Sequence, residues 1–257
     1  MDQQPTFHII QRLRFLSACL LSLVACNTFA SNQFPLPENH QSTYSITKYG
    51  TEVGQIKNDF QYHDQQIIYT SKAIATGVTA FFLKEIITET SHLYWPDDNT
   101  LKTPRQTSYT LQHKKNKKKD QEISFVWSDV NHVDISSSYK NKSATLTSDK
   151  TVWSSQLLPI LMSSYLLHND KITDGSFLIA NKNNLENYNF TLEGHEPIEL
   201  NGKILSCLKF KIIKQDSSRF TYAWLSKNHY YLPLKMEQYK DNELNASIML
   251  KQFKLLK

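Results

Sequence analysis

The stretch YTLQHKKNKKKDQEISFVW, residues 109–127, decides the fold of this chain. Tyr109 and Leu111 alternate with polar residues before the lysine-rich middle of the stretch. Phe125 and Trp127 do the same after it. Alternation with a period of two is typical of strands that bury one face. The stretch therefore predicts a β-hairpin whose tip carries the lysines.

The same alternation extends outward from this hairpin in both directions. Residues 56–62, 208–212 and 220–224 each place apolar side chains at every second position. Tyr and Phe are abundant, with 13 of each, whereas Gly occurs only 6 times, and this composition favours strands. Counting the alternating segments between turn residues predicts roughly twelve strands.

One segment breaks the pattern. Residues 154–168 are apolar on most sides, and Pro159 stands where the first turn of a helix would tolerate it. We therefore expect one long apolar helix that packs against the sheet. The predicted fold is mainly β, a curved antiparallel sheet forming a half-barrel or open barrel around this helix. Residues 43–257 would form this single antiparallel β domain.

The first thirty residues have the pattern of a secretory signal peptide. Arg12 and Arg14 precede an apolar run over residues 15–25, and small residues follow. This run is shorter than the roughly 20 residues that a membrane-spanning helix needs. We expect residues 1–30 to direct export to the periplasm or to the periplasmic face of the outer membrane, with residues 31–42 as a tether.

Two processing sites remain open. The sequence LVAC at residues 23–26 resembles a bacterial lipobox, so that cleavage after Ala25 would leave Cys26 as a lipidated N-terminus. The sequence TFA at residues 28–30 has the small residues of an ordinary processing site. Cleavage after Ala30 would give a protein without a lipid anchor.

Composition excludes several classes of partner and cofactor. The formal net charge is +5, which is too small to indicate nucleic acid, and an exported protein would not meet it. Once Cys19 and Cys26 are set apart with the leader, Cys207 is the remaining cysteine. An intramolecular disulfide and a cysteine-based zinc site are then excluded. We expect Cys207 to be a small buried residue.

No catalytic motif is present. The chain has no G-x-S-x-G elbow, no phosphate-binding loop and no dinucleotide fingerprint. The sequence GHEP at residues 194–197 begins like a zinc-binding helix, but it lacks the second His and is interpreted as a turn. We therefore expect no catalytic residue, no metal site and no cofactor. A hydrolase whose triad is dispersed along the chain remains an alternative.

The charged tip of the central hairpin is a candidate contact site. It could be a solvated turn that discourages edge-to-edge pairing. It could instead touch anionic phospholipid or lipopolysaccharide headgroups, each lysine contributing about 1 kcal/mol. The lysines concerned are Lys114, Lys115, Lys117, Lys118 and Lys119.

Aromatic residues on the alternating strands form the second candidate site. On the concave side of an incompletely closed sheet they could line an apolar cleft for an acyl chain. They could also be ordinary core residues packed against the helix. The five candidates are Tyr109, Phe125, Trp127, Tyr222 and Trp224.

Several landmarks in this order resemble the bacterial family catalogued as domain of unknown function 3108. They are YSITKYGTEVG at residues 44–54, Thr103-Pro104, Phe125-x-Trp127, Trp224-Leu225-Ser226 and LPLKM at residues 232–236. The resemblance implies an exported Gram-negative protein with a curved antiparallel sheet crossed by a helix. This shape is similar to the half-barrels of periplasmic lipoprotein carriers. The family has no defined catalytic or ligand residues to carry over.

The leading hypothesis is a non-enzymatic cell-envelope protein. It would bind a lipid, an acyl chain or a lipoprotein in its curved sheet. It would meet the membrane only through a lipid anchor or through surface contact. One alternative is a structural or assembly partner of another envelope protein, without a small ligand. The other alternative is an unrecognised hydrolase.

Overall fold

The computed structural model describes residues 35–77, 79–80, 85–96, 103–129, 131–169 and 172–256. All of them belong to the unit Gln33–Lys257. The expected signal peptide, both cleavage sites and Cys26 lie outside the described residues. No helix within the described ranges is both long enough and apolar enough to cross a membrane.

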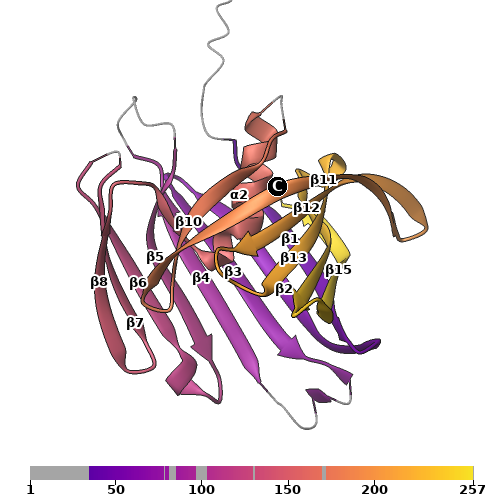
Figure 1. Ribbon diagram of the computed structural model, residues 1–257, viewed down its shortest axis with the longest axis horizontal. Helices are drawn as coiled ribbons and strands as arrows, with labels where there is room; N and C mark the ends of the chain where they lie inside the picture. Colours follow the sequence, from indigo (N-terminus) through magenta and orange to yellow (C-terminus); the bar gives the residue numbers. More distant parts are fainter. Residues whose placement is uncertain are drawn as a thin grey trace, which may run out of the picture. The chain divides into compact units, whose positions relative to one another are not determined.

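The described strands form one sheet of fifteen (Figure 1). Strands that follow each other in sequence lie side by side, except β8 and β9, and β1 also lies beside β15. The first eight are β1 (His40–Lys48), β2 (Thr51–His63), β3 (Gln66–Ala75), β4 (Ile86–Tyr94), β5 (Arg105–His113), β6 (Gln121–Trp127), β7 (Val133–Tyr139) and β8 (Lys142–Ser148). The others are β9 (Val152–Ser154), β10 (Gly175–Asn181), β11 (Asn184–Leu200), β12 (Lys203–Lys214), β13 (Arg219–Ser226), β14 (Leu232–Lys240) and β15 (Glu243–Leu255).

The predicted central hairpin is confirmed. β5 and β6 pair antiparallel, with Tyr109 opposite Ile123 and Leu111 opposite Gln121. Neighbouring strands elsewhere are also antiparallel, except that β9 runs parallel to β10. The sheet is therefore mainly β and meandering, as expected, but it is not purely antiparallel.

The structure has fifteen strands where roughly twelve were expected, and tight turns join several of them. Several hairpins are joined by two residues that both have positive φ, the geometry of a type I′ turn. Asn, Asp and Gly adopt this conformation more readily than other residues. A two-residue turn leaves no loop to mark it in the sequence. The turns are Tyr49–Gly50, Lys140–Asn141, Lys182–Asn183, Asn201–Gly202 and Asp241–Asn242.

The segment GHEP is the second departure from expectation. Residues 194–197 are not a turn but part of β11. The register of β11 against β12 shifts between Leu192 and Gly194, which marks a β-bulge. Gly194 has a φ of 139°, a conformation that a side chain would strain. Gly194 thus permits the bulge in this long strand, while Pro197 pairs with Ser206 in regular register.

The helical segment is shorter than predicted. A 3₁₀ turn, η2 (Ser155–Leu157), leads into α2 (Leu158–His168), which has only eleven residues. Pro159 stands in its first turn, where no backbone N–H is needed. The Asn169 side chain ends the helix by donating to the Tyr165 carbonyl at 2.7 Å. The expected long apolar helix is therefore wrong in length.

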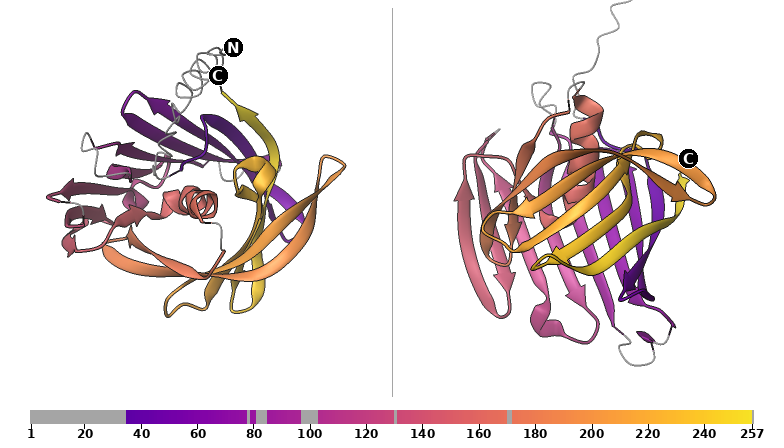
Figure 2. Two further views of the ribbon diagram at one scale, coloured as in Figure 1. Left: turned by 90° about the horizontal axis from the view of Figure 1, so that it is seen from above. Right: turned by 45° about the vertical axis from the view of Figure 1, so that its right-hand side comes forward.

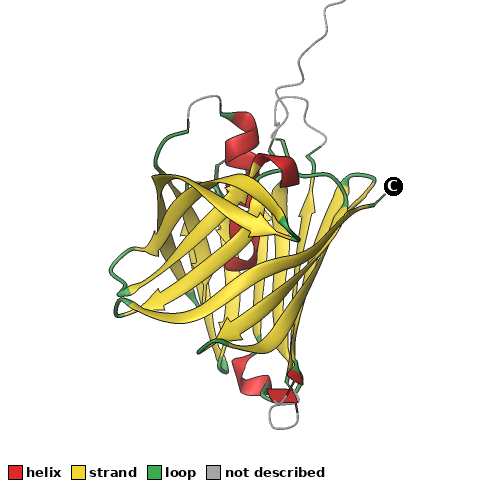
Figure 3. Cartoon of the chain, turned by 90° about the vertical axis from the view of Figure 1, so that its right-hand side faces the viewer, coloured by secondary structure: helices red, strands yellow, loops and turns green. Residues whose placement is uncertain are grey.

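The sheet closes almost completely around α2, which the strands enclose (Figures 2 and 3). The first and last strands, β1 and β15, pair in the middle of the sheet, which leaves β8 and β9 as its edges. Across this seam the Asn183 side chain donates to the Lys142 carbonyl at 3.0 Å and accepts from the Ser137 hydroxyl at 2.8 Å. The expected half-barrel is in fact a nearly closed barrel.

The helix packs against both walls of the barrel. Leu157, Ile160 and Leu161 join a buried cluster with aromatic and aliphatic residues of β2, β3 and β4. Met162 and Leu166 join another with residues of β11, β12 and β13. The apolar character of α2 on all sides is therefore explained by its place inside the sheet.

A buried polar network fixes the start of this helix to the wall. The Gln106 amide donates to the hydroxyls of Ser91 at 3.0 Å and Ser154 at 2.9 Å. The Gln156 amide donates to the carbonyls of Tyr69 and Glu89, each at 3.1 Å. Buried polar groups must be paired to be tolerated, so this network determines where η2 and α2 sit.

Candidate functional site

The barrel encloses a cavity of about 690 Å³ between the first turns of α2 and the inner faces of β11 to β14. Sites for small molecules occupy roughly 300–1,000 Å³ and have mostly apolar walls. This volume is within that range. The apolar part of the wall consists of Leu158, Pro159, Met162, Ile212, Phe220, Ala223, Leu225, Pro233 and Met236.

The lining changes from apolar to basic along three adjacent strands. Residues two apart point to the same face of a strand, so each strand offers a graded series. The series are Leu225, Ala223, Thr221 and Arg219 in β13, Met236, Gln238 and Lys240 in β14, and Ile212 and Lys214 in β12. The apolar end therefore lies beside α2 and the basic end beside the β12–β13 and β14–β15 turns.

One carboxylate lies among these basic residues. Lys214 Nζ is 2.7 Å from Glu186 Oε1, and the Asn181 amide donates to Glu186 Oε2 at 3.2 Å. The Tyr188 hydroxyl donates to the same oxygen at 3.4 Å, and burial raises the pKa of Tyr188 to about 12. Glu186 is thus held in place by partners of its own, and only 9% of its side chain is exposed.

A second cavity of about 190 Å³ adjoins the first, since both are lined by Ser155, Pro159, Pro233 and Met236. Its far wall, on β2 and β4, is polar and includes Asn58 and Glu89. Burial raises the pKa of the Glu89 carboxyl, and the Tyr109 hydroxyl, 3.4 Å away, opposes that shift. Asn58 Oδ1 is buried and has no hydrogen-bond partner among the described residues.

Three of the five predicted aromatic residues lie on the inner face of the sheet. Tyr109 and Phe125 are buried in one cluster with residues of β7, β9 and β10. Trp127 packs at the edge of that cluster and donates from Nε1 to the Gln106 carbonyl at 2.8 Å. None of the three is among the residues that line the two cavities described above.

The other two predicted aromatic residues lie on the face of β13 turned away from α2, where Trp224 is only 2% exposed in another buried cluster. Ala223 and Leu225 pack in the same buried cluster as α2, so Tyr222 and Trp224 project from the opposite face of β13. The ammonium groups of Lys209 and Lys235 lie 5.0 and 4.4 Å from the Trp224 ring centroid. The structure therefore does not bring the five aromatic residues together.

The lysine-rich hairpin tip is exposed, with η1 (Lys117–Lys119) at its end. Asp120 holds the tip in shape, because its carboxylate accepts from the His113 backbone N–H at 2.7 Å. Alternate connections of a meandering sheet lie at the same end. The tip between β5 and β6 therefore shares one end of the barrel with the β12–β13 turn and the basic part of the cavity.

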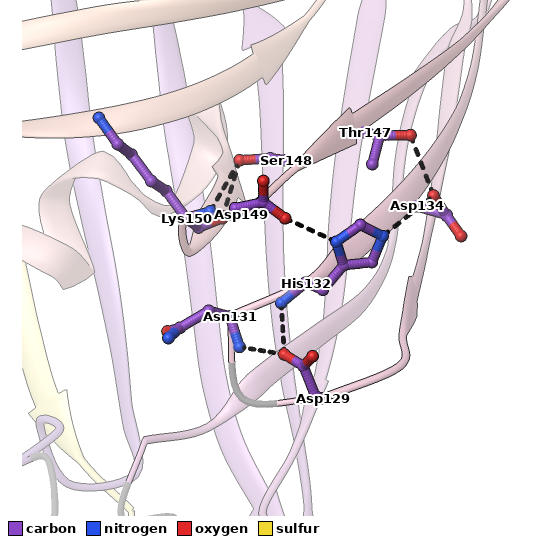
Figure 4. A network of polar contacts seen from close by, with 8 residues as sticks. All are labelled: Asp129, Asn131, His132, Asp134, Thr147, Ser148, Asp149 and Lys150. Carbon is purple, nitrogen blue, oxygen red and sulfur yellow. Dashed lines mark hydrogen bonds and ion pairs between the residues drawn. The ribbon is translucent and has the colours of Figure 1, made fainter.

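A polar network on the outside joins the β6–β7 connection to the β8–β9 connection (Figure 4). His132 Nδ1 is 2.7 Å from Asp149 Oδ1, and this hydrogen bond raises the pKa of His132. Asp129 accepts from the backbone N–H groups of Asn131 and His132, both at 2.8 Å. Among the residues that the structure describes, no group of three or more His, Cys, Asp or Glu side chains is arranged to hold a metal ion.

Cys207 is buried, as expected, and is 1% exposed. Burial raises the pKa of its thiol to about 11. A thiol held neutral in this way is a poor nucleophile, so Cys207 is a packing residue.

Sequence reasoning missed the residues that line the larger cavity. It looked for five aromatic residues, none of which lines this cavity, whereas the lining combines aliphatic residues, methionines and bases with the aromatic residues Tyr188, Phe220 and Tyr239. The signal that could have found it is the change from apolar to basic at every second position. That change recurs in residues 219–225 and 236–240.

Comparison with known proteins agrees with the landmarks noted in the sequence. No curated protein matches the chain. Among solved structures, it is similar to a protein from Bacteroides fragilis described as exported and as having a YmcC-like fold. That likeness has 12% identity, covers 86% of this chain and 98% of the other, and has a TM-score of 0.34. The family described as protein of unknown function (DUF3108) matches residues 42–248, and the chain belongs to this family.

Proposed function

We propose that this protein is a non-enzymatic cell-envelope protein that binds a lipid, an acyl chain or the acyl group of a lipoprotein inside its barrel. The observation that carries the proposal is the cavity of about 690 Å³ beside the first turns of α2. Atoms that line an unfilled space lack dispersion contacts on one side. An apolar chain would supply those contacts, and each buried methylene contributes about 0.8 kcal/mol.

The position of α2 supports this proposal. The helix covers the inner face of the sheet from Leu158 onward, and the buried clusters on both of its sides are closely packed. The cavity begins where the helix begins, because Leu158, Pro159 and Met162 form its end wall. The barrel would therefore hold a ligand in the part of its interior that α2 leaves unfilled.

The signal-peptide pattern of residues 1–30 supports a location in the periplasm or at the periplasmic face of the outer membrane. Lipidation of Cys26 would add an anchor there. Without it, the protein would meet the membrane through surface contact. In either case the protein would work where acylated ligands are abundant.

The proposal can be tested by blocking the cavity. Thr221 lines it and is half-buried, so Thr221→Trp would place an indole in the space that the ligand needs. Thr191 is exposed on the outer face of β11, and Thr191→Trp is the matched control. Binding of an environment-sensitive naphthylamine dye would be followed by fluorescence, and native mass spectrometry would show any lipid that co-purifies.

We expect wild type and Thr191→Trp to bind the dye, and Thr221→Trp to bind it at least tenfold more weakly. Myristate should displace the dye. If Thr221→Trp binds as well as the control, or if wild type binds neither dye nor lipid, the proposed function is wrong. Circular dichroism would establish that both variants are folded.

A further inference from the structure

We infer that the ligand is an anionic amphiphile with a single acyl chain, whose carboxylate or phosphate head is held by Lys214 and Arg219 at the basic end of the cavity. This inference rests on the proposed function and adds the chemistry of the head group. It follows from the charges at the cavity end, from the partners of each basic side chain and from the graded lining.

The charges that line the larger cavity are strongly unbalanced. Apart from tyrosines, the titratable residues that line it are four bases and one acid, Glu186. Four basic side chains therefore stand against one carboxylate in the same space. The basic residues are Lys182, Lys214, Arg219 and Lys240.

The partners of these side chains leave positive charge uncompensated. Lys214 is paired with Glu186. Lys182 lies over the Tyr139 ring at 5.9 Å, and Lys240 Nζ is 3.8 Å from Asp241 at an exposed site, where such a pair contributes little. Arg219 has no ion pair within the described part of the chain. Its guanidinium is therefore free to take up a carboxylate or phosphate, which it can bind with two parallel hydrogen bonds.

Lys214 and Arg219 are the best placed of the four. They flank the turn between β12 and β13, and both belong to the strand faces that line the cavity. Leu225 lies six positions after Arg219, which is about 20 Å along an extended strand. A ligand with its head at Arg219 would thus place its chain along Thr221 and Ala223 and its end beside Met162 on α2.

Glu186 gives a further test of the inference, because its carboxylate competes with the ligand head for the Lys214 ammonium group. Its carboxylate is 2.7 Å from Lys214 Nζ, so an anionic head must share that ammonium group. Removing the negative charge would release Lys214 to the ligand. Glu186→Gln is therefore expected to strengthen the binding of an anionic ligand and to leave that of an uncharged one unchanged.

The test compares three probes with the same chain and different heads, namely myristate, myristyl phosphate and myristyl alcohol. Each would be titrated into the purified protein by calorimetry, below its critical micelle concentration. We expect either anionic probe to bind about tenfold more tightly than the alcohol, as one charge-assisted hydrogen bond would give. The stronger of the two anionic probes identifies the carboxylate or the phosphate as the head.

Two variants and a control assign the effect to the basic end. Lys214→Gln with Arg219→Gln should remove the advantage of the anionic probes and leave the affinity for the alcohol unchanged. Arg219→Gln alone, at an exposed site that should not affect folding, should remove part of it. Lys57→Gln with Lys72→Gln removes the same charge from exposed sites on β2 and β3 and should change nothing.

The outcomes separate this inference from the proposed function. If all three probes bind wild type equally, the head-group inference fails while the proposed function stands. If the double variant weakens the alcohol as much as the anions, Lys214 and Arg219 are structural and the inference again fails. If no probe binds wild type, the proposed function itself fails.

Discussion

The two ends of the barrel differ in what fills them. At one end α2 packs against both walls, and Gln106 and Gln156 fix its start through buried hydrogen bonds. At the other end the wall is graded from Leu225 to Arg219 and encloses a cavity. The same kind of strand serves both ends. The comparison teaches that one short helix divides the interior of this barrel into a part packed with side chains and a part that contains a cavity.

The largest expected effect comes from disrupting the packing of α2 against the walls of the barrel. Leu161 is 2% exposed in α2, between the helix and the wall. Leu161→Ala should lower the free energy of unfolding by about 2–5 kcal/mol, through lost burial and the space left behind. Leu167, on the same helix, is 37% exposed, and Leu167→Ala is the matched control with a much smaller effect. Equal denaturation midpoints for the two variants would show that α2 is a detachable lid.

The next prediction concerns the end of the barrel that contains the cavity, which also carries the lysine-rich tip. If the tip meets anionic headgroups, the protein should float with anionic vesicles at low salt. Flotation should fade as the Debye length falls to about 8 Å near 0.15 M salt. Glutamine at all five positions should abolish flotation without unfolding the protein. The variant replaces Lys114, Lys115, Lys117, Lys118 and Lys119.

The control for this experiment is the double variant of Lys57 and Lys72, which lie away from the tip on exposed positions of β2 and β3. If the tip variant and wild type float equally, the tip does not bind headgroups and is only a solvated turn. The affinity of the tip variant for myristate should be unchanged, because none of these lysines lines the cavity.

Glu89 lies at the smaller cavity and gives a moderate, pH-dependent effect. Burial raises the pKa of its carboxyl, so the folded state favours the protonated form. Its contribution to stability is fully present below its ordinary value of 4.5 and is lost as pH rises through the raised pKa. Glu89→Gln should therefore raise the melting temperature above neutral pH, and the gain should shrink in acid. A gain that is the same at every pH would contradict this account.

The smallest effect is expected at the exposed network around His132. Its hydrogen bond to Asp149 raises the pKa of the imidazole, so the protonated form is favoured in the folded state. The resulting stability is present below 6.5 and is lost as pH rises through the raised pKa. In an NMR titration, Asp149→Asn should lower the pKa of His132 more than Asp134→Asn, because Asp134 is 3.9 Å away. Equal shifts would refute the assignment.

Much of the fold could be predicted because period-two alternation is a local signal. The hairpin of β5 and β6 forms where it was expected, and α2 lies within the predicted apolar run. The number of strands was underestimated in part because β9 has only three residues, Val152–Ser154, which is too short to show alternation. Closure could not be predicted, since it depends on Asn183 reaching Lys142 across 41 residues of sequence.

The candidate site was harder to predict for a related reason. Alternation shows that Tyr222 and Trp224 share a face, but not which face of the sheet meets α2. That choice depends on Ala223 and Leu225, which pack against the helix from the other face. Tyr222 and Trp224 thus lie on the face turned away from α2, where Trp224 is buried in another cluster, whereas Ala223 and Leu225 line the cavity.

The most direct test of the central claim uses the methionine methyl groups as reporters. Met162 and Met236 line the larger cavity, whereas Met249 is paired with Lys235 on the outer face of β15. NMR spectra of isotope-labelled methionine methyl groups would be followed while myristate is added. We expect the signals of Met162 and Met236 to shift together and saturate, and that of Met249 to stay in place. Saturating shifts at Met249 alone, or no shift at Met162 and Met236 while myristate binds, would contradict binding inside the barrel.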